Sequence, residues 1–407
     1  MSTGIPVNNH EMAKYEKVEN SANRSIYVLR DGITPDDLAR DITGKLGKYD
    51  VNGSIYITHL DGLIERYLQW KRCLPRVDVY YAIKCNDDDI ILRIMKQLGV
   101  GFECASQPEV EHVLSIGVKP GNIIIGNPVR TGPFLKYLAA QGVNTLSVDS
   151  EGEMLKIKEL HPKAKLLLRI SVVPSDDELY GREMGIRFGS HIKDIKHLLK
   201  KAKELGLEVL GITYRLIYGN LNPSVHSDIM AKVASVFEIA REFGFDVSLL
   251  DICGGIPKEP GQFDKVGAEL TKALDLHFPE GSGVRIVAEP GRYFASSLGT
   301  VYMNILDKRD KKALVRSYED LCKGPDPEML AGMDLCVHRL RKAGLPDAMY
   351  ICNQSLFQLF SLNFLRDGDG RKIEPLTPPC NGEVKNFVSI LYGMTCCGAD
   401  VLAYSVD

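Results

Sequence analysis

The chain has 407 residues, of which 44% are hydrophobic and 25% are charged. This length is too great for one ordinary hydrophobic core and fits one large barrel with a smaller domain, and the composition is that of a soluble globular protein. The formal net charge of −3 and the isoelectric point near 6.3 give no indication of a protein that binds nucleic acid or an anionic membrane.

The first twenty residues, MSTGIPVNNHEMAKYEKVEN, are polar and contain no apolar core. We therefore expect no secretory signal peptide, and no window of the sequence approaches the length of a transmembrane helix. The ten cysteines follow neither a CxxC pattern nor a zinc-ligand spacing. We expect them to stay reduced in a cytoplasmic protein that holds no metal.

Between about residues 77 and 290, short apolar runs of β-type alternate with segments whose apolar residues recur every three or four positions. Each run is nearly continuous in hydrophobic residues, as buried parallel strands are. Eight such alternations over about 215 residues match the size of a (β/α)8 barrel. The runs are residues 77–83, 100–105, 122–126, 144–149, 165–171, 207–214, 247–253 and 284–289.

A doubly wound open sheet is the alternative architecture. It would need a glycine fingerprint after its first strand, and the sequence YYAIKCNDDD has none. Outside the barrel, residues 22–30 and 53–59 are strand-like, and the last hundred residues mix short strands with loops. We therefore expect an α/β protein with three parts: residues 1–59 contribute strands to a β-domain, residues 60–298 form the barrel, and residues 299–407 form the rest of the β-domain.

In a barrel of this kind, chemistry lies at the carboxyl ends of the strands. Lys84 ends the first run, and a lysine that is partly desolvated there can form a Schiff base, although a strand-end lysine can equally extend its amine into water. The turn CGGIP, residues 253–257, could place backbone N–H groups around a phosphate. The segment AEPGRY places Glu289 and Arg292 after the last run. Glu103, Arg169 and Arg215 occupy equivalent strand ends.

Several long segments in the same order resemble the family of eukaryotic ornithine decarboxylase and its non-catalytic relative, the antizyme inhibitor. They include YYAIKCN, GFECAS, NPVR, LLDICGGIP, SGVRIVAEPGRY and YGMTCCGAD, and the resemblance runs from about residue 25 to 400. It implies a (β/α)8 barrel of fold type III, the alanine-racemase-like barrel, together with a β-domain. It also implies pyridoxal 5'-phosphate as the cofactor.

The resemblance assigns roles to individual residues. Lys84 matches the lysine that binds pyridoxal phosphate covalently, and Glu289 matches the carboxylate that keeps the ring nitrogen protonated. Arg292 matches a ligand of the phosphate. Glu103 and Arg169 match polar residues that line the cofactor pocket.

The phosphate-binding segments depart from the family. Where the family has His-Val-Gly-Ser-Gly, this chain has RLIYG at residues 215–219: Arg215 could stack on the ring, but Ile217 and Tyr218 place bulk in the phosphate seat. Cys253 replaces the first glycine of the triplet that Gly254 and Gly255 complete, which adds a side chain where backbone should approach an anion. The chain also ends at Asp407, before a family segment whose tyrosine reaches the phosphate, so we expect a truncated β-domain and doubtful cofactor binding.

The substrate-binding positions depart from the family as well. Cys396 matches the cysteine that a partner subunit contributes to protonate the product carbon. Two family carboxylates that hold the distal amine of ornithine are replaced by Gln354 and Cys397. A buried cation without an anionic partner is costly, so the sequence disfavours ornithine as a substrate.

Several charged residues match family positions that contact other protein chains. Four of them match family residues that form salt bridges across a dimer, namely Asp149, Arg187, Arg309 and Asp400. They favour a homodimer or a heterodimer with a paralogue, although surface charges contribute little. Lys136 and Arg130 fall where the family presents a basic helix to antizyme, and an ordinary charged helix is the alternative.

Two functions of different classes follow. The first is a regulator with a degraded phosphate site, impaired in catalysis, which binds antizyme as a decoy and belongs to polyamine metabolism. The second is an active pyridoxal-phosphate decarboxylase that acts on a neutral amino acid. A subunit that donates Cys396 to an active paralogue is a further possibility.

Overall fold

The computed structural model describes residues 15–19, 25–45, 54–172, 188–214, 223–296, 298–310, 348–353, 389–392 and 401–406. The chain divides into two compact units. One contains Met1–Thr58 and Thr300–Asp407, and the other contains His59–Gly299. We describe each unit separately.

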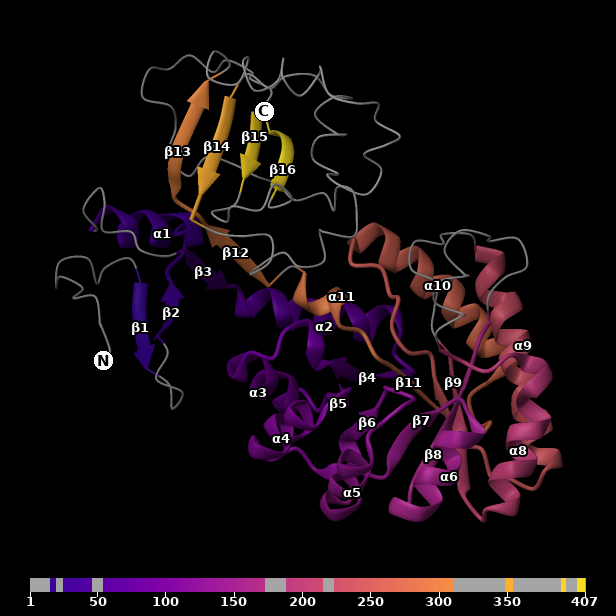
Figure 1. Cartoon of the computed structure of the whole chain (residues 1–407). Helices are drawn as coiled ribbons and strands as arrows, with labels where there is room; N and C mark the ends of the chain where they lie inside the picture. Colours follow the sequence, from indigo (N-terminus) through magenta and orange to yellow (C-terminus); the bar gives the residue numbers. More distant parts are fainter. Residues whose placement is uncertain are drawn as a thin grey trace, which may run out of the picture. The chain divides into compact units, whose positions relative to one another are not determined.

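The unit His59–Gly299 is built on a closed barrel of parallel strands in the order β10-β11-β4-β5-β6-β7-β8-β9 (Figure 1). Because β11 pairs in parallel with β4, the last strand closes on the first, and the open doubly wound sheet is excluded. The predicted (β/α)8 barrel is confirmed, with one strand inside each predicted run. The strands are β4 (Val77–Ala82), β5 (Gly101–Cys104), β6 (Ile123–Ile125), β7 (Thr145–Val148), β8 (Lys165–Ile170), β9 (Glu208–Tyr214), β10 (Leu249–Asp251) and β11 (Arg285–Ala288).

Helices surround the barrel (Figure 1). Several begin at side-chain caps: the Thr131 hydroxyl accepts from the backbone N–H of Phe134, and the Ser150 hydroxyl accepts from that of Glu153. The helices of this unit are α2 (Leu60–Cys73), α3 (Asp89–Gln97), α4 (Gln107–Ser115), α5 (Gly132–Gln141), α6 (Glu151–Leu160), α8 (Ile195–Glu204), α9 (Pro223–Glu242), α10 (Pro260–His277) and α11 (Arg292–Ala295).

Two apolar layers hold this unit together. Residues that alternate along the strands pack outward against the helices, where Trp70 of α2 is fully buried, donates its indole N–H to the Val77 carbonyl at 2.9 Å and stacks on Phe263. The other residues form a smaller buried cluster: Tyr80, Ile124, Leu167, Leu249 and Val287. This filled barrel is a rigid support for side chains at the strand ends.

The other unit is rich in strands. A hairpin of β1 (Tyr15–Glu19) and β2 (Ser25–Leu29) precedes α1 (Pro35–Gly44), which begins at a capping box formed by Thr34 and Asp37. We expected residues 1–59 to contribute strands to the β-domain. Within them, β3 (Ile55–Thr58) pairs with β12 (Gly299–Tyr302). A four-stranded sheet contains β13 (Ile305–Asp310), β14 (Ala348–Cys352), β15 (Ser389–Tyr392) and β16 (Val401–Val406).

Candidate active site

A pocket of about 80 Å³ lies where strands β4, β10 and β11 end. Its lining includes five residues that the sequence predicts as cofactor ligands, namely Lys84, Gly254, Gly255, Glu289 and Arg292. Each follows the carboxyl end of its strand, so the barrel rule places them together. Cys253 lines the same pocket.

Lys84 stands in the short 3-10 turn Ile83–Cys85 that follows β4. Its amine forms an ion pair with the carboxylate of Glu103 on β5, and half of the lysine side chain is exposed while the glutamate is buried. Burial alone lowers the pKa of Lys84, but attraction to Glu103 and Glu289 outweighs it and raises the pKa above its ordinary value. The amine is therefore held as an ammonium ion at neutral pH.

Both glutamates of the site have a pKa above the ordinary value of a carboxyl group. Burial, with repulsion from Glu289, raises the pKa of Glu103 to about 7 against the opposing pull of Lys84. Burial, with repulsion from Asp251, raises the pKa of Glu289 to about 8. Oε1 of Glu289 is buried and accepts no hydrogen bond among the residues that the structure describes, whereas the protonated form of Glu289 can donate a hydrogen bond to the neighbouring Asp251. The site thus contains an acceptor that a bound molecule can satisfy.

Cys253 connects Glu289 to a second buried acid. The thiol Sγ donates to Oε2 of Glu289 at 2.9 Å, and the backbone N–H of Cys253 donates to Oδ1 of Asp251 at 2.8 Å. Oδ2 of Asp251 accepts from the Thr213 hydroxyl at 2.7 Å. Burial raises the pKa of Asp251 to about 6, against these hydrogen bonds, which lower it.

The remaining predicted ligand, Arg169 of β8, lies close to this cluster. It is nearly buried, donates to the Gly126 carbonyl at 3.3 Å and stacks on the ring of Phe188. Its charge contributes to lowering the pKa of Glu289. Gly126 also makes room for Glu103, because a Cβ at that position would lie 2.5 Å from the Glu103 carboxylate. Glu103 and Arg169 therefore lie near the pocket, and their role in lining a cofactor stays a prediction.

Residues 60–296 match the family described as pyridoxal-dependent decarboxylase, pyridoxal binding domain. The chain belongs to this family. Ornithine decarboxylase of Rattus norvegicus is 36% identical over 286 residues, which cover 70% of this chain and 61% of the rat protein. Antizyme inhibitor 2 of Xenopus laevis is 29% identical over 383 residues, which cover 93% of this chain and 78% of the frog protein.

Solved structures agree with this membership. The arginine decarboxylase of Paramecium bursaria Chlorella virus, bound to agmatine, superposes with a TM-score of 0.75 at 28% identity and covers 91% of this chain and 89% of that chain. The resemblance to the family of ornithine decarboxylase and antizyme inhibitor is thereby confirmed, and so is the fold.

Several predicted residues of this decarboxylase-family chain lie outside the described residues. These are Arg215 with the rest of the RLIYG loop, Gln354, Cys396, Cys397, Arg187 and Asp400. Two predicted dimer residues are described: the Asp149 carboxylate accepts from the Gly189 backbone N–H at 2.9 Å, and the exposed Arg309 is paired with Asp307 at 3.5 Å. Both contacts are within the chain, so the dimer stays a prediction.

The buried position of Arg130 differs from the prediction that this residue is presented to antizyme. Its side chain is fully buried, where Nε pairs with Glu153 at 3.0 Å and Nη1 donates to the Asn127 carbonyl. An arginine in this position presents no charge at the surface. Lys136 of α5 is exposed, so it alone of the two remains available to a partner.

Asp251 and Thr213 support the turn at Cys253 beside the candidate site, and the sequence did not point to them. Asp251 is the one acidic residue in the apolar run VSLLDIC, and a carboxylate in a buried strand needs a hydrogen-bond donor. An acidic residue inside an apolar run could therefore have pointed to a buried hydrogen-bonded carboxylate. Thr213 gave none, because a threonine in a β-strand is common.

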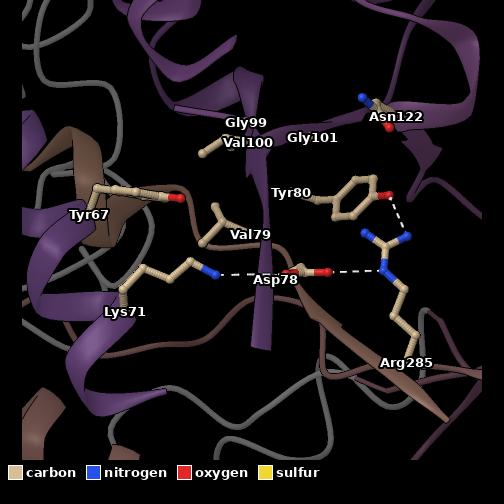
Figure 2. A pocket seen from close by; sticks show the side chains of 10 residues that line it. All are labelled: Tyr67, Lys71, Asp78, Val79, Tyr80, Gly99, Val100, Gly101, Asn122 and Arg285. Carbon is tan, nitrogen blue, oxygen red and sulfur yellow. Dashed lines mark hydrogen bonds and ion pairs between the residues drawn. The ribbon is translucent and has the colours of Figure 1, made fainter. Parts of the chain in front are cut away.

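A second pocket lies at the opposite, amino-terminal end of the barrel strands (Figure 2). There Asp78 accepts from Nε of Arg285 at 3.0 Å and is paired with Lys71 at 3.8 Å, while Arg285 Nη1 donates to the Tyr80 hydroxyl. Since barrel chemistry is found at the carboxyl ends, we interpret this pocket as an ion-pair network that closes the barrel base.

The described residues contain neither a metal site nor a membrane-spanning helix. Over the residues that the structure describes, no group of three or more histidine, cysteine or acidic side chains is arranged to hold a metal ion. Among those residues, no helix is both long and apolar enough to cross a bilayer.

We expect the stability of the cofactor-free protein to fall as the pH rises from 5.5 to 8. Glu289 has a pKa of about 8 in the folded chain and an ordinary one when unfolded, so the folded state binds more protons in this window. Between these two pH values, the free energy of unfolding of Glu289→Gln should therefore fall by on the order of 1–3 kcal/mol less than that of the wild type. Urea unfolding at both pH values measures the difference. The exposed Glu238→Gln is the control. An unchanged pH dependence in Glu289→Gln would contradict the assignment.

Proposed function

We propose that this chain is an ornithine-decarboxylase-like protein of polyamine metabolism that retains the ring-binding end of a pyridoxal phosphate site. We further propose that it is impaired as a decarboxylase and acts as a regulator, in the manner that the name antizyme inhibitor indicates. It would work as a homodimer or as a heterodimer with a paralogue.

The observation that carries the cofactor assignment is the unpartnered Oε1 of Glu289 beside the Lys84 amine. A buried acceptor without a donor costs about 1–3 kcal/mol, and a protonated ring nitrogen would satisfy it. Lys84 lines the same pocket and can reach a bound carbonyl group. The residues present therefore fit the ring end of pyridoxal phosphate.

The chain's own residues would share the work at this site. When bound, pyridoxal phosphate supplies a ring that accepts the electrons left by loss of carbon dioxide. Glu289 would hold the proton of the ring nitrogen, and Arg292 with the backbone of Gly254 and Gly255 would bind the phosphate. Glu103 pairs with the Lys84 ammonium, and its pKa of about 7 suits it to accept the proton that the amine must lose before it reacts.

Impairment is supported by the sequence of the loop after β9. Residues 215–219 read RLIYG, so that Ile217 and Tyr218 stand where the family has small residues next to the phosphate. The regulatory role is supported by the match to antizyme inhibitor 2 of Xenopus laevis, which extends over 93% of this chain. Lys136, exposed on α5, would contribute to the surface that antizyme binds.

An active decarboxylase acting on a neutral amino acid is the second candidate. It is favoured by the geometry of Lys84 and Glu289, which keeps the two groups that the chemistry needs in one pocket. Gln354 and Cys397 replace two family carboxylates, so an ornithine side-chain ammonium would be buried without an anion.

The two candidates are separated by two assays on the same purified protein. We expect carbon dioxide release from ornithine, or from any of a set of neutral amino acids, to stay at the level of the Lys84→Ala variant. We also expect the protein to bind purified antizyme and to displace ornithine decarboxylase from it. Turnover of a neutral amino acid above that level would establish the second candidate, and failure to bind antizyme would remove the regulatory role.

A further inference from the structure

Cys253 occupies a backbone conformation that side chains rarely adopt. Its φ of +53° is the one positive value at a non-glycine position among the described residues. A left-handed conformation costs a residue with a Cβ roughly 1–2 kcal/mol. Its N–H donates to Asp251 and its carbonyl accepts from the Glu289 N–H at 2.7 Å, so the turn is fixed from both sides.

This conformation directs the side chain of Cys253 at Glu289. Sγ lies 2.9 Å from Oε2 of the glutamate, which is a close contact for a thiol donor. The sequence led us to expect that the side chain obstructs the phosphate seat. In the structure Cys253 lines the pocket together with Gly254 and Gly255, and its thiol contacts the Glu289 carboxylate. The expected obstruction of the phosphate seat stays a prediction.

The thiol gives the two carboxyl oxygens of Glu289 different hydrogen-bonding environments. Oε2 has a fixed donor, and Oε1 is buried with no partner in the described part of the chain. We propose that Cys253 is a positioning residue, whose thiol orients Glu289 so that Oε1 is presented to a ligand that carries a proton on a ring nitrogen. This inference rests on the proposed cofactor site, and it deepens it by naming the side chain that orients Glu289.

The electrostatics of the cluster agree with a donating thiol. Burial, with repulsion from Glu289 and Asp251, raises the pKa of Cys253 well above its ordinary value. The thiol therefore keeps its proton and remains a donor at neutral pH. The hydrogen bond in turn lowers the pKa of Glu289, although burial and repulsion from Asp251 outweigh it and raise that pKa to about 8.

The test compares two ligands that differ at one atom. Pyridoxal phosphate and its 1-deaza analogue, in which a CH group replaces the ring nitrogen, are titrated into wild type and Cys253→Ala. Alanine keeps a Cβ at the same φ, so the backbone cost is unchanged and only the thiol is lost. We expect Cys253→Ala to weaken the binding of pyridoxal phosphate about tenfold and to leave the binding of the analogue unchanged. Cys253→Ser should recover part of the lost affinity. Equal weakening of both ligands, or of neither, would overturn the inference.

An infrared measurement on the cofactor-free protein tests the contact itself. The difference spectrum of wild type minus Cys253→Ala isolates the S–H stretch of this thiol from those of the other cysteines. We expect the band at the low frequency of a hydrogen-bonded thiol, and a rise in frequency in Glu289→Gln. A band that does not respond to Glu289→Gln would refute the positioning role. If wild type binds neither ligand while the band responds, the proposed cofactor site is what fails.

Discussion

Replacing Lys84 with alanine is expected to abolish the near-visible absorbance that develops when cofactor-free protein is mixed with pyridoxal phosphate. Lys84 is the lysine that lines the pocket beside Glu289, so no other amine is placed there within the described residues. The expected change is complete loss of the band at equal protein and cofactor concentrations. An absorbance titration measures it directly.

Lys84→Ala also leaves Glu103 buried without its cation, so the variant must be shown to fold. Circular dichroism checks this, and we expect a native spectrum because Glu103, with a pKa of about 7, can protonate instead of carrying a charge. Lys158→Ala, which removes an exposed lysine of α6, is the matched control and should keep the band. A band that survives in Lys84→Ala would assign the attachment to another lysine.

Arg130→Met is expected to destabilise the barrel unit by about 3 kcal/mol. The arginine and Glu153 are both buried, and removal of the arginine takes away one of the two cations that pair with the buried carboxylate. Lys156 lies 2.6 Å from the second oxygen of Glu153 and limits the loss. Urea unfolding of the purified variant measures the change.

Two further variants check this interpretation of Arg130. Lys136→Met removes an exposed charge from the next helix and should change the free energy of unfolding by less than about 0.5 kcal/mol. In the double variant Arg130→Met, Glu153→Met no charge is stranded, so much of the stability should return. If Arg130→Met unfolds like the wild type but loses antizyme binding, the residue would instead belong to an interaction surface.

The barrel could be predicted from the sequence because its strands are buried on both faces. Each strand then reads as a continuous apolar run, and the three-residue strand β10 lies within the predicted run 247–253. Arg130 shows the limit of this reasoning. A guanidinium in a loop before a helix reads as a surface group, and its burial depends on Glu153, which is distant in the sequence but adjacent in the fold.

The site was predictable where its residues stand at strand ends. Lys84, Glu289 and Arg292 are of this kind, since the barrel topology brings strand ends to one rim. The role of Cys253 was not predictable, because the direction of its thiol depends on a positive φ that the sequence does not specify. The same holds for the free oxygen of Glu289, which depends on which oxygen the thiol holds.

The site that we propose binds the ring of pyridoxal phosphate in an intact manner and its phosphate in an impaired one. The most direct test of this claim is the affinity of the cofactor-free protein for pyridoxal compared with pyridoxal phosphate, with Lys84→Ala as the blank. A functional phosphate seat contributes several charge-assisted hydrogen bonds, each of about 1.5–3 kcal/mol, and would favour the phosphate ester by more than a hundredfold. We predict that the two dissociation constants agree within about tenfold. A hundredfold preference for pyridoxal phosphate would contradict the claim and favour an active decarboxylase.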